Sequence, residues 1–251
     1  MNTRSISFLV ATAIVGGAGV AQAVPLGDKA SIELFAGGNV TVPGSFSGIR
    51  TQPANAPEGS LAFDHVGFDD AYDQRYTGGA ELDYAFDPRL TGFARASYSQ
   101  FDGRTRDLGT VSVLDTRTPV DARFADGNAR SLDLGARYLF APGARLRPFI
   151  GLGLGASDES TPRAFIENPD GSSTRVELAK GGTVFEQRLE TGVQMSPLPN
   201  FDLRLTAAAN HLDGQKSSGD PNLELLGVAP SHSTIGPRWQ YPAELGAVWH
   251  F

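Results

Sequence analysis

Residues 131–140 read SLDLGARYLF, and their apolar and polar side chains alternate along the whole stretch. One face carries Leu132, Leu134, Ala136, Tyr138 and Phe140. The opposite face carries Ser131, Asp133, Gly135, Arg137 and Leu139. Successive side chains of a β-strand point to opposite faces, so a period of two indicates a strand. A helical period would not keep the charged residues off every second position. The stretch therefore predicts a strand with one wholly apolar face.

The same pattern recurs along the chain, and the apolar faces carry no charged residue apart from Arg130, which begins its stretch. The alternating stretches are 30–40, 75–86, 90–101, 130–140, 146–157, 183–195, 201–212 and 240–251. A strand of about eleven residues at ~3.3 Å per residue is ~36 Å long. Tilted by ~40°, it covers ~28 Å, close to the thickness of the hydrocarbon layer of a membrane. We therefore predict eight membrane-spanning strands.

The connections between these strands alternate in length. Three are short and contain proline, at 87–89, 141–145 and 196–200. Four are long, at 41–74, 102–128, 158–182 and 213–239. Short turns at one end and long loops at the other are typical of outer-membrane barrels. The fold class expected is all-β, an eight-stranded antiparallel up-and-down transmembrane β-barrel with short periplasmic turns and four long extracellular loops.

Aromatic residues gather near both ends of the predicted strands. Near the periplasmic ends lie Tyr84, Phe86, Tyr138, Phe140, Phe201 and Trp249, with Phe251 after them. Near the outer ends lie Tyr76, Tyr98, Phe185 and Tyr241. Membrane–water interfaces select two such belts, so the aromatic residues favour a transmembrane barrel independently of the alternation.

Residues 1–23 read as a secretory signal peptide. Arg4 supplies the positive charge, residues 6–20 form an apolar run, and Ala21-Gln22-Ala23 matches the small-x-small cleavage pattern. We expect cleavage after Ala23, which leaves 24–251 as one barrel domain. A membrane anchor is the alternative reading, but the run is short and glycine-rich and no stop-transfer charges follow it.

The composition excludes several classes of protein. The chain of 251 residues has no cysteine, which excludes disulfides, thiolate metal sites, a cysteine nucleophile and a lipoprotein anchor. Its formal net charge of −7 gives no support for binding nucleic acid.

Four features occur together in this chain: the signal peptide, the eight alternating stretches, the strand at 147–153, which reads RPFIGLG, and the terminal Trp249-His250-Phe251. With these features the chain resembles the small OmpA-like outer-membrane β-barrel proteins of Gram-negative bacteria. The resemblance implies a place in the cell outer membrane, among its lipid and lipopolysaccharide. It also implies that Phe251 is the C-terminal signal that the barrel assembly machinery recognises. The peptidoglycan-binding periplasmic domain of full-length OmpA is missing, so we do not expect tethering to the cell wall.

The inward faces of the predicted strands are unusually ionic. The predicted ion network of the lumen comprises Glu33, Glu81, Asp83, Arg95, Asp133, Arg137, Arg147, Glu186, Arg188, Glu190, Arg204 and Glu244. The interior of an eight-stranded barrel is just wide enough for its own side chains. Charges in that space must pair, because an unpaired ion loses its hydration without compensation. We expect a closed polar core, with a narrow ion-conducting path as the alternative.

Three stretches of the sequence bear a partial likeness to catalytic, phosphate or metal sites. The glycines of 151–155 lack the Lys-Ser/Thr and the helix of a phosphate loop. His211, beside Asn210 and followed by Asp213, is the best-placed histidine for a lipid A-modifying enzyme, but Asp213 departs from the His-x-Ser motif of the deacylases. The acids Asp64, Asp69, Asp70 and Asp73 near His65 could bind a divalent cation, but their spacing matches no EF-hand loop.

We expect no enzyme, cofactor or metal site. The function expected is that of a monomeric cell-envelope barrel with a structural or surface-interaction role through its long loops, since loops of this length usually serve recognition or are partly disordered. A narrow, porin-like channel for small solutes is the first alternative, and a lipid A-modifying enzyme is the second.

Overall fold

The computed structural model describes residues 29–42, 45–47, 61–63, 66–67, 71–113, 116–167, 172–177, 179–215 and 234–251. The predicted signal peptide with its cleavage site after Ala23 lies outside these residues, as do Asp64, His65, Asp69 and Asp70. Within the described part of the chain, no helix is long and apolar enough to cross a membrane.

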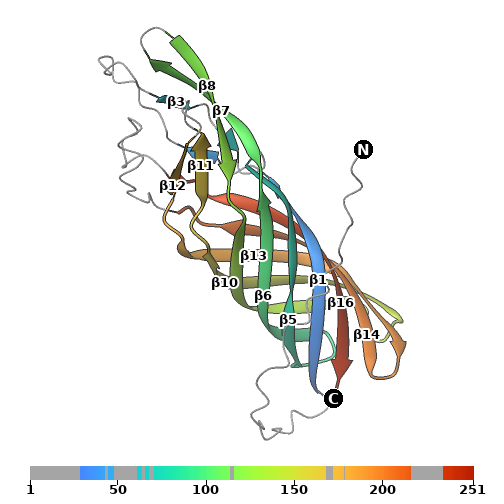
Figure 1. Cartoon of the computed structure of the whole chain (residues 1–251). Coiled ribbons are helices and arrows are strands. Elements are labelled where there is room, and N and C mark those ends of the chain that lie inside the picture. Colours follow the sequence, from blue (N-terminus) through green and yellow to red (C-terminus); the bar gives the residue numbers. More distant parts are fainter. Residues whose placement is uncertain are drawn as a thin grey trace, which may run out of the picture.

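The described strands form a closed antiparallel barrel of eight strands, in the order β1-β16-β14-β13-β10-β9-β6-β5 (Figure 1). The strands are β1 (Ala30–Val42), β5 (Tyr72–Ala85), β6 (Leu90–Gly103), β9 (Gly127–Leu139), β10 (Leu146–Glu159), β13 (Gly182–Leu198), β14 (Phe201–Leu212) and β16 (Arg238–His250). Each strand pairs with its neighbours in the chain, and β1 closes the barrel by pairing with β16 from Ser31↔His250 to Val42↔Trp239. The predicted up-and-down barrel is confirmed.

Several strands are longer than predicted. β10 continues to Glu159 and β16 begins at Arg238, so each adds an inward position to the barrel interior. β13 runs to Leu198 and takes up most of the turn predicted at 196–200. Its register with β14 shifts between Met195 and Leu198, which indicates a β-bulge there.

The exterior of the barrel is apolar. Leu132 and Leu134 on β9 are 62% and 63% exposed, and Leu152 and Leu154 on the adjacent β10 are 66% and 59% exposed. These leucines lie together, because Leu154 pairs with Leu134 and Leu152 lies two residues along. A contiguous apolar surface of this kind is unfavourable in water, whereas the lipid-facing band of a membrane barrel requires it.

The predicted aromatic belts lie on the same exterior. Neighbouring rings pack edge to face in the pairs Tyr84–Phe86, Tyr138–Phe140 and Phe201–Trp249, with centroid distances of 5.4, 5.4 and 5.5 Å. Tyr76, Tyr98, Phe185 and Tyr241 are exposed as well. Their role as interface anchors stays a prediction.

The two ends of the barrel differ. Residues 86–89, 140–145 and 199–200 form short turns at the end that we call the short-turn end. At the opposite, long-connection end, a five-stranded sheet continues beyond the barrel, as Figure 1 shows for its labelled strands. We call it the outer sheet; in spatial order its strands are β12 (Ser173–Glu177), β11 (Arg163–Glu167), β8 (Thr116–Phe124), β7 (Thr105–Val113) and β3 (Leu61–Phe63).

The outer sheet corrects the prediction that 102–128 and 158–182 are loops. β7 and β8 extend the hairpin of β6 and β9, and β11 and β12 extend that of β10 and β13. A second, three-stranded sheet contains β15 (Thr234–Ile235), β2 (Ser45–Ser47) and β4 (Val66–Gly67).

One side of the outer sheet is an apolar core of its own. Its buried side chains are Ala122, Phe124, Ala164, Ile166 and Val176. Residues of the other side alternate with them, and Arg123 and Arg175 are exposed there. Because the charged residues face out and the apolar ones face in, this region follows the pattern of a water-soluble protein.

Candidate functional site: the charged lumen

Strand alternation brings charged side chains into the barrel interior. Of the twelve residues predicted for the lumen, eleven are at most 4% exposed; the twelfth, Arg147, is half-buried. The middle of β10 contributes three glycines to this interior, at 151, 153 and 155. They leave room for long side chains from the other strands, since a Cβ on Gly151 would come within 2.7 Å of the Glu190 carboxylate.

Arg137 and Arg204 hold the centre of the lumen together. Arg137 lies 2.6 Å from Glu190, 3.0 Å from Glu81 and 3.3 Å from Asp83. Arg204 lies 2.7 Å from Glu81 and 2.6 Å from Asp83, and it also pairs with Glu33. The planar guanidinium group suits such multiple pairing, because its donors form a rigid fork.

Arg95 and Arg188 extend these pairs toward the long-connection end. Arg95 lies 2.7 Å from Glu244 and 3.5 Å from Glu81. Arg188 lies 2.8 Å from both Glu244 and Glu190. Together these nine residues form one continuous set, which we call the central network: Glu33, Glu81, Asp83, Arg95, Arg137, Arg188, Glu190, Arg204 and Glu244. They come from every barrel strand except β10.

Three phenylalanines pack against the central network. The Arg95 guanidinium carbon lies 3.4 Å from the centroid of the Phe35 ring. The guanidinium carbon of Arg137 lies 4.9 Å from the ring centroids of both Phe93 and Phe149. Through cation–π contacts of this kind, aromatic rings fill space beside the arginines and also stabilise their positive charges.

Arg147 belongs to a second cluster at the short-turn end, which Gln194 links to Arg204 of the central network by hydrogen bonds. It pairs with Asp202 and donates a 2.6 Å hydrogen bond to Ser196. The His250 ring nitrogen Nε2 lies 2.7 Å from the same Asp202 carboxylate. Asp202 was not predicted as a lumen residue, although it shares the inward alternation of Arg204.

A third ionic contact lies at the long-connection end. Arg238 pairs with Glu159, which also accepts a 2.8 Å hydrogen bond from Gln215. Nearby strand ends carry buried aromatic residues: the Tyr72 ring lies 4.8 Å from Phe101 and 5.9 Å from Phe124. The predicted strands ended before 159 and began after 238, so the sequence reasoning missed this pair.

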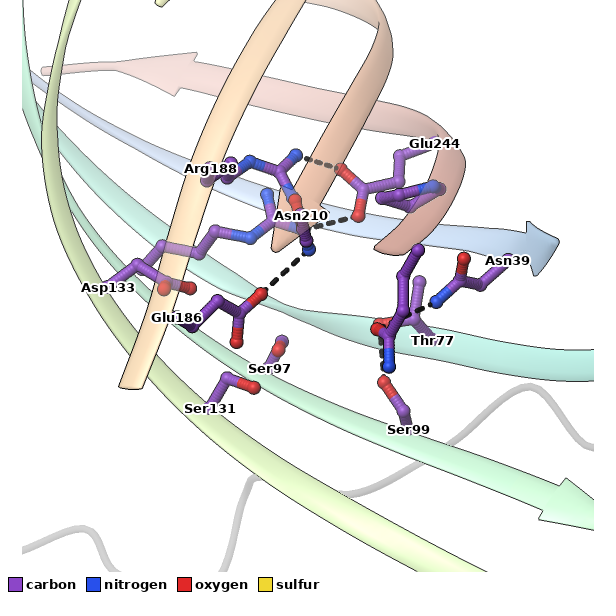
Figure 2. Close-up of a pocket in the computed structure, with 13 residues that line it drawn as sticks. Asn39, Thr77, Ser97, Ser99, Ser131, Asp133, Glu186, Arg188, Asn210 and Glu244 are labelled. Carbon is purple, nitrogen blue, oxygen red and sulfur yellow. Dashed lines mark hydrogen bonds and ion pairs between the residues drawn. The ribbon is translucent and has the colours of Figure 1, made fainter. Parts of the chain in front are cut away.

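Asp133 and Glu186, the last two predicted residues, line a small polar pocket with Arg95, Arg188 and Glu244 (Figure 2). Glu186 accepts a 2.7 Å hydrogen bond from Asn210. One Asp133 oxygen is buried and has no hydrogen-bond partner in the part of the chain that the structure describes. The prediction that every lumen charge is paired therefore does not hold for Asp133.

Among the described residues, one group of three acids approaches a metal-binding arrangement, but arginine already bridges it. Oxygens of Glu33, Glu81 and Asp83 lie within 4.8 Å of one another. Arg204 contacts all three carboxylates and so supplies the positive charge that a metal ion would bring. In the loop cluster considered for a cation, Asp73 is exposed and pairs with Arg104.

His211 and its neighbour Asn210 point to opposite sides of β14. Asn210 is buried in the lumen, whereas the His211 ring packs edge to face on Trp239 with centroids 4.9 Å apart. Asp213 is exposed beyond the strand. His211 and Asn210 therefore do not face a common space.

A closed eight-stranded barrel with an apolar exterior and an ionic interior defines an outer-membrane β-barrel protein. The chain is a protein of the outer membrane with the architecture expected of the small OmpA-like barrels. The terminal Phe251 N–H lies 3.3 Å from the Ala30 carbonyl oxygen, beside the strand pair that closes the barrel.

No family model and no curated protein matches the chain. Among solved structures, OprG from Pseudomonas aeruginosa is similar, with 14% identity, 90% of this chain and 99% of that chain covered, and a TM-score of 0.47. Neisserial surface protein A has 13% identity, coverage of 88% and 97%, and a TM-score of 0.45. The outer membrane protease OmpT from Escherichia coli has 9% identity, coverage of 89% and 97%, and a TM-score of 0.46. Similarities this distant give no information on activity, and the class rests on the barrel's own closure, exterior and interior.

Proposed function

We propose that this protein is a non-enzymatic barrel of the Gram-negative envelope with a structural or surface-interaction role. Its lumen is closed by the central network, and its long connections lie at the cell surface. The observation behind the closed lumen is that each of the four central arginines pairs with at least two buried carboxylates.

Closure follows from the cost of moving these charges. The interior of an eight-stranded barrel is filled by side chains of ordinary size. To open a path, an arginine such as Arg137, which is 1% exposed, would have to leave three carboxylates. Separating a buried ion pair leaves uncompensated charges and costs about 3–5 kcal/mol. The network therefore supports a static core rather than a conducting path.

The outer sheet supports the surface role. Its apolar side is covered, so its exposed charged side is a formed surface rather than an unstructured loop. Arg123 lies over the Phe165 ring, 5.2 Å from its centroid, on this exposed side. Arginine with an aromatic neighbour suits anionic partners, so we include lipopolysaccharide among the partners proposed for this face.

Insertion into the membrane is proposed to use the C-terminal strand. Trp249 and Phe251 are both exposed on the exterior side at the end of β16. They therefore remain accessible as an aromatic signal for the barrel assembly machinery.

Planar-bilayer conductance of the purified, folded barrel tests the closed lumen. We expect the wild-type protein to show no discrete openings at neutral pH. An Arg137→Ala, Arg204→Ala double variant removes two cations of the central network and should conduct more often than wild type. An Arg123→Ala variant, altered only on the outer sheet, is the matched control and should stay silent. Regular openings of the wild-type protein would contradict the closed lumen and support the narrow channel.

A further inference from the structure

The register across β10 repeats one arrangement at two levels of the lumen. At the first level, Gly151 lies between Arg137 on β9 and Glu190 on β13. Glycine has no side chain, so the two long side chains meet over it, and the Arg137 guanidinium lies 2.6 Å from Glu190. An acid and a base thus face each other across a glycine.

At the second level, closer to the long-connection end, both flanking residues are acids. Gly155 lies between Asp133 on β9 and Glu186 on β13. The Asp133 carboxylate fills the space above the glycine, since its Oδ1 lies 2.2 Å from the position that a Cβ of Gly155 would take. The geometry of the first level is repeated, but no flanking residue brings the positive charge.

The two arginines that line the pocket in the described part of the chain form their ion pairs with other acids. Arg95 and Arg188 line the pocket, but they form their ion pairs with Glu81, Glu190 and Glu244. The pocket thus contains three carboxylates and two guanidinium groups as its ionisable groups. Asp133 is 2% exposed, and its Oδ1 has no hydrogen-bond partner among the described residues. A buried carboxylate oxygen without a partner is costly, so a cation bound beside it would be stabilising.

We propose that Asp133 and Glu186 bind one hard divalent cation, Ca²⁺ in the first place, over Gly155. The backbones of β9 and β13 are roughly 10 Å apart, being separated by one strand. Both acidic side chains reach inward into the same pocket, where Ca²⁺ would take oxygen ligands at ~2.3–2.6 Å.

The chemistry of the pocket decides the class of ion. Its lining offers carboxylate, hydroxyl and amide oxygens, including those of Ser97 and Ser131, but no histidine or cysteine (Figure 2). Oxygen donors select Ca²⁺ and Mg²⁺ over the transition metals. Ca²⁺ accepts flexible donor geometry, whereas Mg²⁺ demands a near-octahedral set, so Ca²⁺ is the first choice. The cavity of about 20 Å³ has room for about one water molecule or one ion.

This cation site is separate from the proposed function, because it concerns the charge balance of one pocket. It would hold whether the barrel conducts or not, and whatever its outer sheet binds. A conductance measurement can therefore contradict the closed lumen without affecting the cation site, and a binding measurement can contradict the cation site without affecting the closed lumen.

The test is isothermal titration of the folded barrel in detergent with Ca²⁺, at neutral pH and constant ionic strength, with Mg²⁺ titrated in parallel. We expect one saturable Ca²⁺ site in the wild-type protein. Asp133→Asn and Glu186→Gln each remove one ligand charge and should weaken binding at least ~10-fold. Asp121→Asn removes an exposed acid of the outer sheet and serves as the control, with unchanged affinity.

A second variant separates loss of a ligand from loss of structure. Asp133→Arg places a base opposite Glu186 and copies the Arg137–Glu190 pair. We expect this variant to be folded, to bind no Ca²⁺ in the pocket, and to have an unfolding midpoint independent of Ca²⁺. The wild-type midpoint should rise with Ca²⁺. Absence of a saturable site in the wild-type protein would overturn the proposal, as would equal affinities of the wild type, Asp133→Asn and Glu186→Gln. If Asp133 and Glu186 share a proton and bind no cation, the wild-type protein will show no saturable site.

Discussion

The barrel wall and the outer sheet are made from the same hairpins but bury opposite kinds of side chain. In the barrel wall, Leu152 on β10 is 66% exposed on the exterior, whereas the charged Arg188 on the adjacent β13 is 3% exposed in the interior. In the outer sheet, Ile166 on β11 is 3% exposed, whereas Arg123 on the adjacent β8 is exposed. The alternation of the strands is unchanged, and only the assignment of the two faces is reversed.

This reversal shows that the surroundings, not the strand, decide which side chains are hidden. Apolar side chains turn toward lipid where lipid is present and toward each other where water is present. The two regions should also differ in what stabilises them. Ion pairs hold the interior of the barrel, whereas apolar burial holds the outer sheet. Substitutions confined to one of the two regions therefore test this difference.

The largest effect is expected from the central network. Arg137→Ala removes one of the arginine partners from each of three buried carboxylates and leaves the central network with excess negative charge, so we expect a loss of about 3–5 kcal/mol in the free energy of unfolding. Arg123→Ala on the outer sheet should change it by less than about 0.5 kcal/mol. Urea unfolding in lipid vesicles measures both variants. Equal midpoints would mean that the lumen charges are not energetically paired.

A somewhat smaller effect is expected on the barrel exterior. Leu134 lies near the middle of β9 and is 63% exposed, and Leu134→Arg would place a charge in the hydrocarbon layer. The expected cost is about 2–4 kcal/mol. Ser173→Arg places the same side chain at an exposed position of β12, opposite Glu167, and should be nearly neutral. If Leu134→Arg were also neutral in vesicles, the exterior would face water.

The smallest effect on the barrel is expected from the core of the outer sheet. Ile166→Ala leaves a cavity that costs about 2–4 kcal/mol locally. Hydrogen exchange should accelerate in β8, β11 and β12, while the urea midpoint of the barrel stays unchanged, because separate regions can open independently. A matching fall in the barrel midpoint would show that the two regions unfold as one unit.

Much of the barrel could be predicted from the sequence, because one rule governs every strand. Alternation with period two placed all eight strands and the inward direction of residues as far apart as Glu33 and Glu244. The same rule covers Asp202, which shares its face with Arg204. Glu159 and Arg238 escaped because strand ends are set by pairing with neighbours rather than by pattern, and both lie in the added ends.

The partners of each charge and the outer sheet could not be predicted. Alternation shows that Arg147 points inward. It does not show that Asp202 lies at the same height in the barrel, because that depends on the register between strands. β7, β8, β11 and β12 lie in stretches rich in Gly, Pro, Ser, Asp and Thr that resemble loops. They become strands through tertiary pairing, such as that of Ala164 with Phe124, which local sequence does not encode.

Heat modifiability on cold SDS gels tests the central claim, a closed barrel in the outer membrane, most directly. The protein is taken from the outer-membrane fraction and compared with and without boiling. A closed barrel held by pairing all round its circumference resists the detergent, so the unboiled sample should migrate differently from the boiled one. No shift in mobility, with the protein in the soluble fraction, would contradict the barrel and would mean that the alternating strands form a water-soluble β-structure.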